Sequence, residues 1–234
     1  MSIADNLARV RERIDAAAHR AGRRPEDIAL MAVSKTFPPE AIREAYDAGA
    51  RLFGENRVQE YAGNIDWLRD LKDAEFHLIG HLQSNKAAKA VEVFSAVDSV
   101  DSLRLAQKLN ASAQQSGKKI SVLIEINVGG EIAKSGVAPG SRELEELLSG
   151  AQALPRLEIH GLMTVPPFSE DPHQARPYFR QLRELRDQIA ARKLPGIDMK
   201  TLSMGMSHDF EVAIEEGSTC VRVGTAIFGE RSKG

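Results

Sequence analysis

The segment that decides the fold is residues 28–35, IALMAVSK, in which six apolar residues in succession end in a serine and a lysine. An unbroken apolar run of this length predicts a strand that is buried on both faces, as strands of parallel sheets are. Helical segments separate this run from the next ones, and strands that alternate with helices predict an α/β fold with parallel pairing. The other apolar runs are residues 51–56, 76–80, 96–100, 121–128, 157–165, 201–207 and 220–228.

Eight such runs predict a closed (β/α)8 TIM barrel, with a doubly wound open sheet as the rival architecture. An extra helix precedes the first strand, because apolar residues recur at helical spacing there. No linker or shift in composition divides the chain, so we expect residues 1–234 to form a single domain. The residues that mark individual helices are Ile3, Leu7, Val10, Ile14 and Gly22 in the first, Pro38, Pro39 and Gly49 in the second, Val58, Ala62, Ile65 and Leu68 in the third, and Asp209 as cap and Gly217 as end of the last long one.

Composition excludes several classes of protein. The formal net charge is −2 and basic residues alternate with acidic ones, which argues against a nucleic-acid partner. No apolar run is long enough to predict a membrane span, and the first residues do not have the pattern of a signal peptide. Cys220 is the one cysteine, so an internal disulfide is excluded. These features predict a cytoplasmic protein.

Polar residues gather where the predicted strands end, which is where barrels of this type carry their active groups. Lys35 follows the first apolar run directly. A lysine in this position is commonly one that simply leaves the core for water. If it were partly desolvated, its pKa would fall, and the neutral amine could attack an aldehyde. Lys35 alone leaves both interpretations open.

The last two strand ends favour the second interpretation. Barrels often bind phosphate with the loops after strands seven and eight, and Ser207, Gly224 and Thr225 lie there. Ser207 could instead be only a helix cap. Arg222 lies between two valines, so strand alternation predicts that it points into the barrel. A buried guanidinium needs a partner, which could be Glu55, another barrel carboxylate, or a ligand atom such as a pyridine nitrogen.

Two other patterns do not support a site. Residues 129–135, GGEIAKS, resemble a P-loop but lack the glycine that should precede the lysine, so we reject a nucleotide site. His77 and His81 are four residues apart on a strand-like segment, where they would not share a helical face. We expect no acidic or cysteine set near them and therefore no metal site.

Six motifs in order identify a resemblance to a known family. The motifs are residues 32–35 (AVSK), 53–60 (FGENRVQE), 76–86 (FHLIGHLQSNK), 160–163 (HGLM), 202–207 (LSMGMS) and 221–229 (VRVGTAIFG). With these motifs the chain resembles the pyridoxal phosphate homeostasis proteins from its first helix to Gly229.

The resemblance implies a barrel like the N-terminal domain of alanine racemase, which holds pyridoxal 5′-phosphate (PLP) as a Schiff base on Lys35. It places Ser207, Gly224 and Thr225 at the phosphate, with Ser203 as a second phosphate candidate. It places Arg222 near the ring nitrogen and Asn56 near the ring. It also implies a role in vitamin B6 homeostasis, as carrier or regulator.

Chemistry favours a carrier over an enzyme. An arginine stays protonated and only donates to the ring nitrogen, so the ring remains a weak electron sink. Racemases also need a second base, a tyrosine in alanine racemase, and we expect Tyr46, Tyr61 and Tyr178 to lie on helices. Three functions stay open: a PLP carrier, an amino-acid racemase or decarboxylase, or a barrel that binds another phosphate compound. As a carrier, the protein could supply PLP-dependent apoenzymes, and we expect it to be a monomer or weak dimer.

Overall fold

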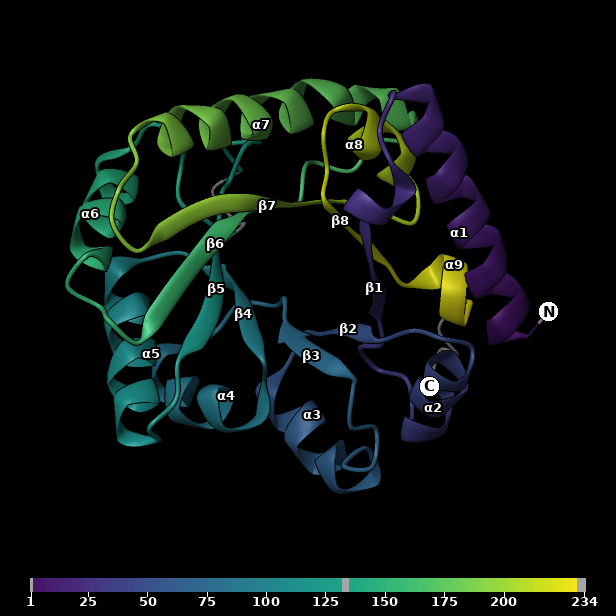
Figure 1. Cartoon of the computed structure of the whole chain (residues 1–234), viewed down its shortest axis with the longest axis horizontal. Helices are drawn as coiled ribbons and strands as arrows, with labels where there is room; N and C mark the ends of the chain where they lie inside the picture. Colours follow the sequence, from purple (N-terminus) through teal and green to yellow (C-terminus); the bar gives the residue numbers. More distant parts are fainter. Residues whose placement is uncertain (1, 132–134, 231–234) are drawn as a thin grey trace.

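The strands close into a parallel barrel. The computed structural model describes residues 2–131 and 135–230, and in this part of the chain each strand pairs with the next while β8 pairs back with β1 (Figure 1). The TIM-barrel prediction is therefore confirmed, and the open-sheet alternative is excluded. The strands are β1 (Ala29–Val33), β2 (Leu52–Glu55), β3 (Glu75–Leu78), β4 (Ala96–Val100), β5 (Ile120–Glu125), β6 (Leu157–Met163), β7 (Ile197–Met206) and β8 (Cys220–Val223).

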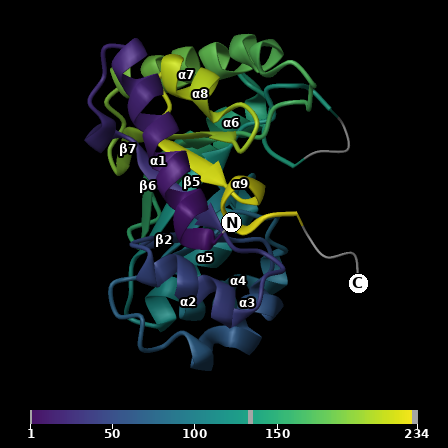
Figure 2. The same ribbon diagram turned by 90° about the vertical axis from the view of Figure 1, so that its right-hand side faces the viewer.

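The helices surround the barrel, and the predicted extra N-terminal helix is present as α1. It packs beside α8 and α9, which Figure 2 shows from the side. The Asn6 side-chain amide donates to the Ile227 carbonyl at 2.8 Å, and Arg13 pairs with Glu211 at 3.1 Å. The helices are α1 (Ile3–Arg20), α2 (Pro39–Asp47), α3 (Val58–Asn64), α4 (Ala87–Val93), α5 (Leu103–Gln115), α6 (Arg142–Ala151), α7 (Arg176–Ala191), α8 (Phe210–Glu215) and α9 (Thr225–Phe228).

Most residues of the strands are buried on both faces, as their largely apolar runs predict. One set of side chains, including Ala32, Phe53 and Val221, joins the large core between strands and helices. Met31 and Leu123 are also buried but lie outside that core. Because successive side chains of a strand point to opposite faces, these two point into the barrel.

Two of the predicted strands differ from the structure by four residues or more at one end, whereas the other bounds differ by three residues or fewer. The prediction of a strand over residues 220–228 is wrong beyond Val223, because residues 225–228 form helix α9. Ile227 there is fully buried and the Phe228 ring stacks on Phe37, so the segment is apolar for reasons of helix packing. An apolar run this short does not distinguish strand from helix.

Strand β7 begins at Ile197, four residues before the predicted start at residue 201. Its first residues include Asp198 and Lys200, which interrupt the apolar run. The third predicted helix also ends early, because residues 65–67 form a separate 3-10 turn after Asn64.

Candidate functional site

Lys35 lies at the corner of a tight turn that follows β1. The Phe37 amide donates to the Ser34 carbonyl at 3.0 Å, which closes the turn around Lys35 and Thr36. Thr36 has φ = 70°, a left-handed conformation that costs a β-branched residue strain energy. The Lys35 side chain is half-buried at the carboxyl end of the barrel. The turn therefore fixes where the amine emerges.

A buried carboxyl group lies next to this turn. The Ser34 hydroxyl donates to Glu55 Oε1 at 2.5 Å, and both residues are buried. Burial raises the pKa of Glu55 to about 7, although the Ser34 hydrogen bond and the charge of Lys35 oppose the rise. The carboxyl group beside Lys35 thus exchanges its proton near neutral pH.

Ser207, at the end of β7, forms a cradle of donors with the start of α9. Its Oγ accepts hydrogen bonds from the amides of Gly224 at 3.2 Å and Ala226 at 3.3 Å. Thr225 begins α9 between these two amides and is exposed. Backbone N–H groups that converge on one point, with hydroxyls beside them, form the kind of cradle in which barrels of this type hold phosphate.

Ser207 does not cap α8 in this arrangement. Asp209 precedes α8, but its carboxylate accepts from the Met206 amide at 2.6 Å and makes no capping bond to the helix. Asp209 is thus the N-cap residue of α8, as predicted, but without the side-chain hydrogen bond that usually accompanies this position. Because Asp209 holds the loop after β7 instead, Ser207 is directed towards β8.

The lysine turn and the cradle meet because β1 and β8 are neighbours. Ala32 is in register with Val223, so the residues that follow each strand emerge side by side. A Cβ atom at Gly224 would lie 3.4 Å from the Val33 carbonyl oxygen. Lys35 and Gly224 are thus on the same rim of the barrel.

Arg222 points into the barrel, as alternation predicts, and it is 3% exposed. Its Nη1 donates to Ser203 Oγ and its Nη2 to the Thr164 carbonyl, both at 2.7 Å. Glu55, one of the predicted partners, is instead hydrogen-bonded to Ser34. Ser203 is fully buried and occupied with Arg222, which argues against direct contact with a phosphate. It orients the guanidinium instead.

Asn56 lies one strand further round the rim. It follows β2 and lines a separate hollow of about 240 Å³ with Arg57 and His81. Its backbone is packed so closely on Gly80 that a Cβ there would come within 2.3 Å of the Asn56 carbonyl oxygen. Gly80 in the FHLIGHLQSNK motif therefore fixes the position of Asn56.

Glu125 is a buried carboxyl group inside the barrel that the sequence patterns did not single out. It ends β5, is 9% exposed, and its Oε2 has no hydrogen-bond partner among the residues the structure describes. Burial and the charge of Asp101 raise its pKa to about 7, against the opposing charge of Arg222. A glutamate inside the apolar run of residues 120–126 was the signal that could have drawn attention to it.

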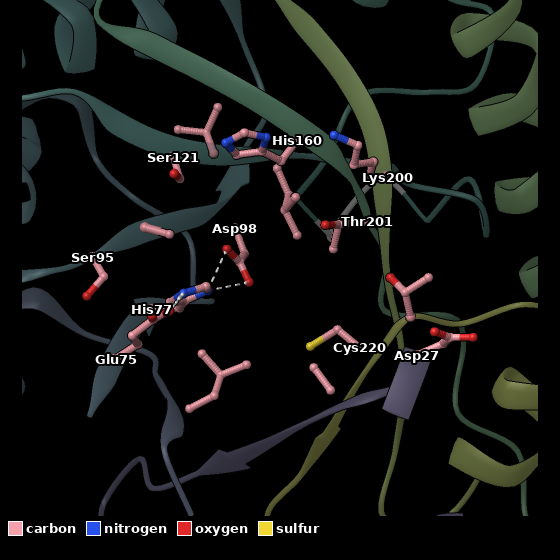
Figure 3. A pocket seen from close by; sticks show the side chains of 16 residues that line it. Asp27, Glu75, His77, Ser95, Asp98, Ser121, His160, Lys200, Thr201 and Cys220 are labelled. Carbon is pink, nitrogen blue, oxygen red and sulfur yellow. Dashed lines mark hydrogen bonds and ion pairs between the residues drawn. The ribbon is translucent and has the colours of Figure 1, made fainter. Parts of the chain in front are cut away.

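A cavity of about 660 Å³ lies at the opposite, amino end of the barrel. Figure 3 shows the side chains of His77 and Asp98 pointing toward each other in its lining, to which Cys220 also belongs. His77 Nδ1 is 3.2 Å from Asp98 Oδ1, and His81 Nδ1 is 3.3 Å from Asp101 Oδ2. The prediction that these histidines have no acidic neighbours is therefore wrong.

These histidine pairs do not amount to a metal site. Within the part of the chain that the structure describes, no three histidine, cysteine or acidic residues form a metal-binding group. Among the same residues no helix is long and apolar enough to cross a membrane. Of the P-loop-like segment, residues 132–134 lie outside the described residues.

The three tyrosines lie on helices, as predicted. Tyr46 is on α2 and donates to Asp73, Tyr61 is on α3 and stacks on Phe76, and Tyr178 is on α7. None of them ends a strand at the carboxyl rim. The chain therefore offers no tyrosine at the rim as a second base.

The donor set at the rim fits PLP. Lys35 carries an amine that can react with its aldehyde, converging amides and hydroxyls suit its phosphate, and a guanidinium suits its ring. These groups lie on β1, β7 and β8 and the segments that follow them, which are consecutive round the barrel. The fit rests on the chemistry of these groups and on the pairing of β1 with β8.

Comparison with known proteins agrees with this chemistry. The family model described as the N-terminal domain of alanine racemase matches residues 6–232, so the fold and the site define a barrel of the alanine racemase type. The pyridoxal phosphate homeostasis protein of Aquifex aeolicus is 48% identical over 231 residues, 99% of this chain and 99% of the relative. That of Escherichia coli K12 is 47% identical over 237 residues, 98% and 97% of the two chains. The chain belongs to the pyridoxal phosphate homeostasis protein family.

Solved structures of other proteins have the same barrel fold. PipY of Synechococcus elongatus with PLP bound is 38% identical, with a TM-score of 0.84 over 97% of this chain and all of that one. The alanine racemase of Clostridium difficile is 17% identical, with a TM-score of 0.72, and this chain covers 58% of it. That second likeness concerns the barrel fold alone.

Proposed function

We propose that this chain binds PLP at the carboxyl rim of the barrel and holds it covalently on Lys35. The amine of Lys35 condenses with the aldehyde of PLP, a C=N bond forms, and water leaves. The observation that carries the proposal is the meeting of the Lys35 turn with the Ser207–Gly224 cradle on neighbouring strands. PipY, which is described as having PLP bound, supports the same ligand.

The remaining site residues follow from the chemistry of each part of the cofactor. Ser207, Gly224 and Thr225 hold the phosphate through a hydroxyl and backbone amides. Arg222 donates to the ring nitrogen, and Ser203 holds Arg222 in place. Asn56, which follows β2, is the residue that the resemblance implies near the ring, although it lines a separate hollow on the rim.

The role we infer is cytoplasmic PLP homeostasis, as a carrier or regulator without turnover. An arginine at the ring nitrogen leaves the ring a weak electron sink. The relatives from Aquifex aeolicus and Escherichia coli are named as homeostasis proteins. An accessible cofactor at the rim suits transfer to PLP-dependent apoenzymes, and the protein acts as a monomer or weak dimer.

The alternative is an amino-acid racemase or decarboxylase of the same barrel type, which the match to the family model of the alanine racemase N-terminal domain leaves open. Incubation of the PLP-loaded protein with L-alanine and other L-amino acids distinguishes the two functions. We expect no sustained formation of D-isomers or amines. Steady turnover would replace the carrier proposal with the enzyme.

Lys35→Ala tests the covalent attachment. PLP bound to the wild-type chain should give a near-visible absorbance band that borohydride abolishes, and peptide mapping should then locate the added mass on Lys35. The variant should lose the band while its circular dichroism spectrum stays that of the folded barrel. A variant that retained the band, or mass found on another lysine, would refute the assignment.

A further inference from the structure

Glu125 is a buried carboxyl group whose second oxygen has no partner. Ser121 and Leu123 line the cavity at the amino end of the barrel. Since side chains alternate along a strand, Glu125 lies on the same inner face, nearer the carboxyl rim. It is 9% exposed, and Oε2 makes no hydrogen bond to any residue that the structure describes.

An unpaired carboxyl oxygen at such a position is costly. Buried polar atoms in folded proteins nearly always have a hydrogen-bond partner, and leaving one out destabilises the fold. Where a partner is missing inside a ligand site, a bound molecule can supply it. The partner of Oε2 would then be a polar atom of the cofactor that no other residue binds.

The charged groups around Glu125 decide which form it takes. Asp101 follows β4 and its negative charge disfavours ionisation, whereas Arg222 on β8 favours it. Together with burial they bring the pKa of Glu125 to about 7. Its protonated form is therefore well populated at neutral pH and can donate a hydrogen bond.

PLP has four polar parts, and the proposed function accounts for three of them. The aldehyde belongs to Lys35, the phosphate to the Ser207 cradle, and the ring nitrogen to Arg222. The part left over is the phenolic oxygen, a strong acceptor when ionised. Glu125 interacts electrostatically with Arg222 and lies inside the same barrel.

We propose that Glu125 is a further cofactor-contacting residue, whose protonated carboxyl group donates a hydrogen bond to the phenolic oxygen of PLP. This inference rests on the proposed function. Because binding then favours the protonated carboxyl group, it raises the pKa of Glu125 further. By linkage, PLP binds more tightly below the pKa of the free protein and progressively more weakly as pH rises through it.

Glu125→Gln isolates this effect, because a glutamine has nearly the same shape and donates at every pH. PLP dissociation constants are measured by absorbance titration between pH 6 and 8.5 for the wild type and the variant. Ionisation of Lys35 and of the PLP phosphate affects both proteins alike and cancels in the ratio of the two constants. We expect the dissociation constant of the wild type, divided by that of Glu125→Gln, to increase about tenfold over this pH range. This change corresponds to a rise of one unit in the pKa of Glu125 when PLP binds.

Two further experiments distinguish a direct contact between Glu125 and the phenolic oxygen from other effects of the substitution. Glu125→Met has similar volume and no donor, and it should bind PLP weakly at all pH values, like the wild type at high pH. With 3-deoxypyridoxal 5′-phosphate, which lacks the phenolic oxygen, the ratio of wild type to Glu125→Gln should be independent of pH. Thermal unfolding of each ligand-free protein at each pH provides the control for folding.

The failure of this inference differs from failure of the proposed function. A ratio independent of pH, with borohydride still fixing PLP on Lys35, refutes the role of Glu125 alone. A methionine variant that binds as tightly as the glutamine variant refutes it as well. If borohydride fixes no PLP on Lys35 in the wild type, the proposed function itself is wrong.

Discussion

At the scale of single residues, backbone strain at Thr36 lies next to the proposed site residue Lys35. A threonine with a positive φ costs of the order of 1–2 kcal/mol relative to an ordinary conformation. Such a conformation persists where the surroundings hold it, and here the Ser34–Phe37 hydrogen bond does so. The preceding residue is Lys35, so the strained corner determines where the amine points.

Thr36→Gly should separate stability from binding. Glycine adopts this conformation without strain, so the free energy of unfolding should not fall and could rise by up to about 1 kcal/mol, since added freedom in the unfolded chain offsets part of the gain. The freer turn should weaken PLP binding several-fold. Urea unfolding and PLP titration measure the two effects. Lys193, which has φ = 50°, offers a matched control: Lys193→Gly should leave PLP affinity unchanged, and an unchanged affinity in Thr36→Gly would contradict the role of the turn.

At the scale of elements, the loop after β7 and the start of α9 act as one unit. Ser207 Oγ joins them by accepting two backbone amides. Ser207→Ala removes that acceptor and also one hydroxyl donor from the phosphate cradle. We expect PLP affinity to fall about tenfold, the value of one hydrogen bond to a charged group. Pyridoxal, which lacks the phosphate, is the control ligand: a comparable loss of affinity for pyridoxal would show that the substitution disturbs the site in general.

The sequence predicts elements better than it predicts their ends. Largely apolar runs located the eight strands of the barrel, because both faces of a barrel strand are mostly buried. The end of β8 was missed because residues 225–228 are apolar for a different reason, the contact of α9 with α1. The start of β7 was missed because Asp198 and Lys200 face solvent at the barrel's amino end.

At the candidate site, the sequence predicts the direction of a side chain better than its hydrogen-bond partners. The orientation of Arg222 follows from alternation between two valines, and the structure confirms it. Its pairing with Ser203 and Thr164 depends on the register of β6, β7 and β8, which no local pattern encodes. Glu125 was missed for a similar reason, because its unpaired oxygen is evident only in three dimensions.

At the scale of the whole molecule, the barrel has polar side chains at both of its ends. The carboxyl end carries Lys35, Arg222 and the cradle. The amino end contains the ion pair between His77 and Asp98. Burial alone would lower the pKa of His77, but the charges of Asp98 and Glu75 outweigh it and raise the pKa to about 9. The pair therefore stabilises the fold fully below the ordinary histidine pKa and loses that contribution as pH rises through about 9.

Two buried carboxyl groups make the ligand-free barrel less stable as pH rises from acidic to neutral. Burial raises the pKa of Glu55 and of Glu125 from 4.5 to about 7 in the folded state. Between these values the folded state binds more protons than the unfolded chain, so the free energy of unfolding falls with rising pH, by of the order of 3 kcal/mol for each group. The double variant Glu55→Gln/Glu125→Gln carries neither titration, and the amide oxygen that it places beside Ser34 can still accept from that hydroxyl. Urea unfolding of the ligand-free proteins at pH 5 and 7.5 should show a smaller loss of stability in the variant than in the wild type. Equal losses in both proteins would mean that these carboxyl groups ionise in the folded barrel as readily as in the unfolded chain.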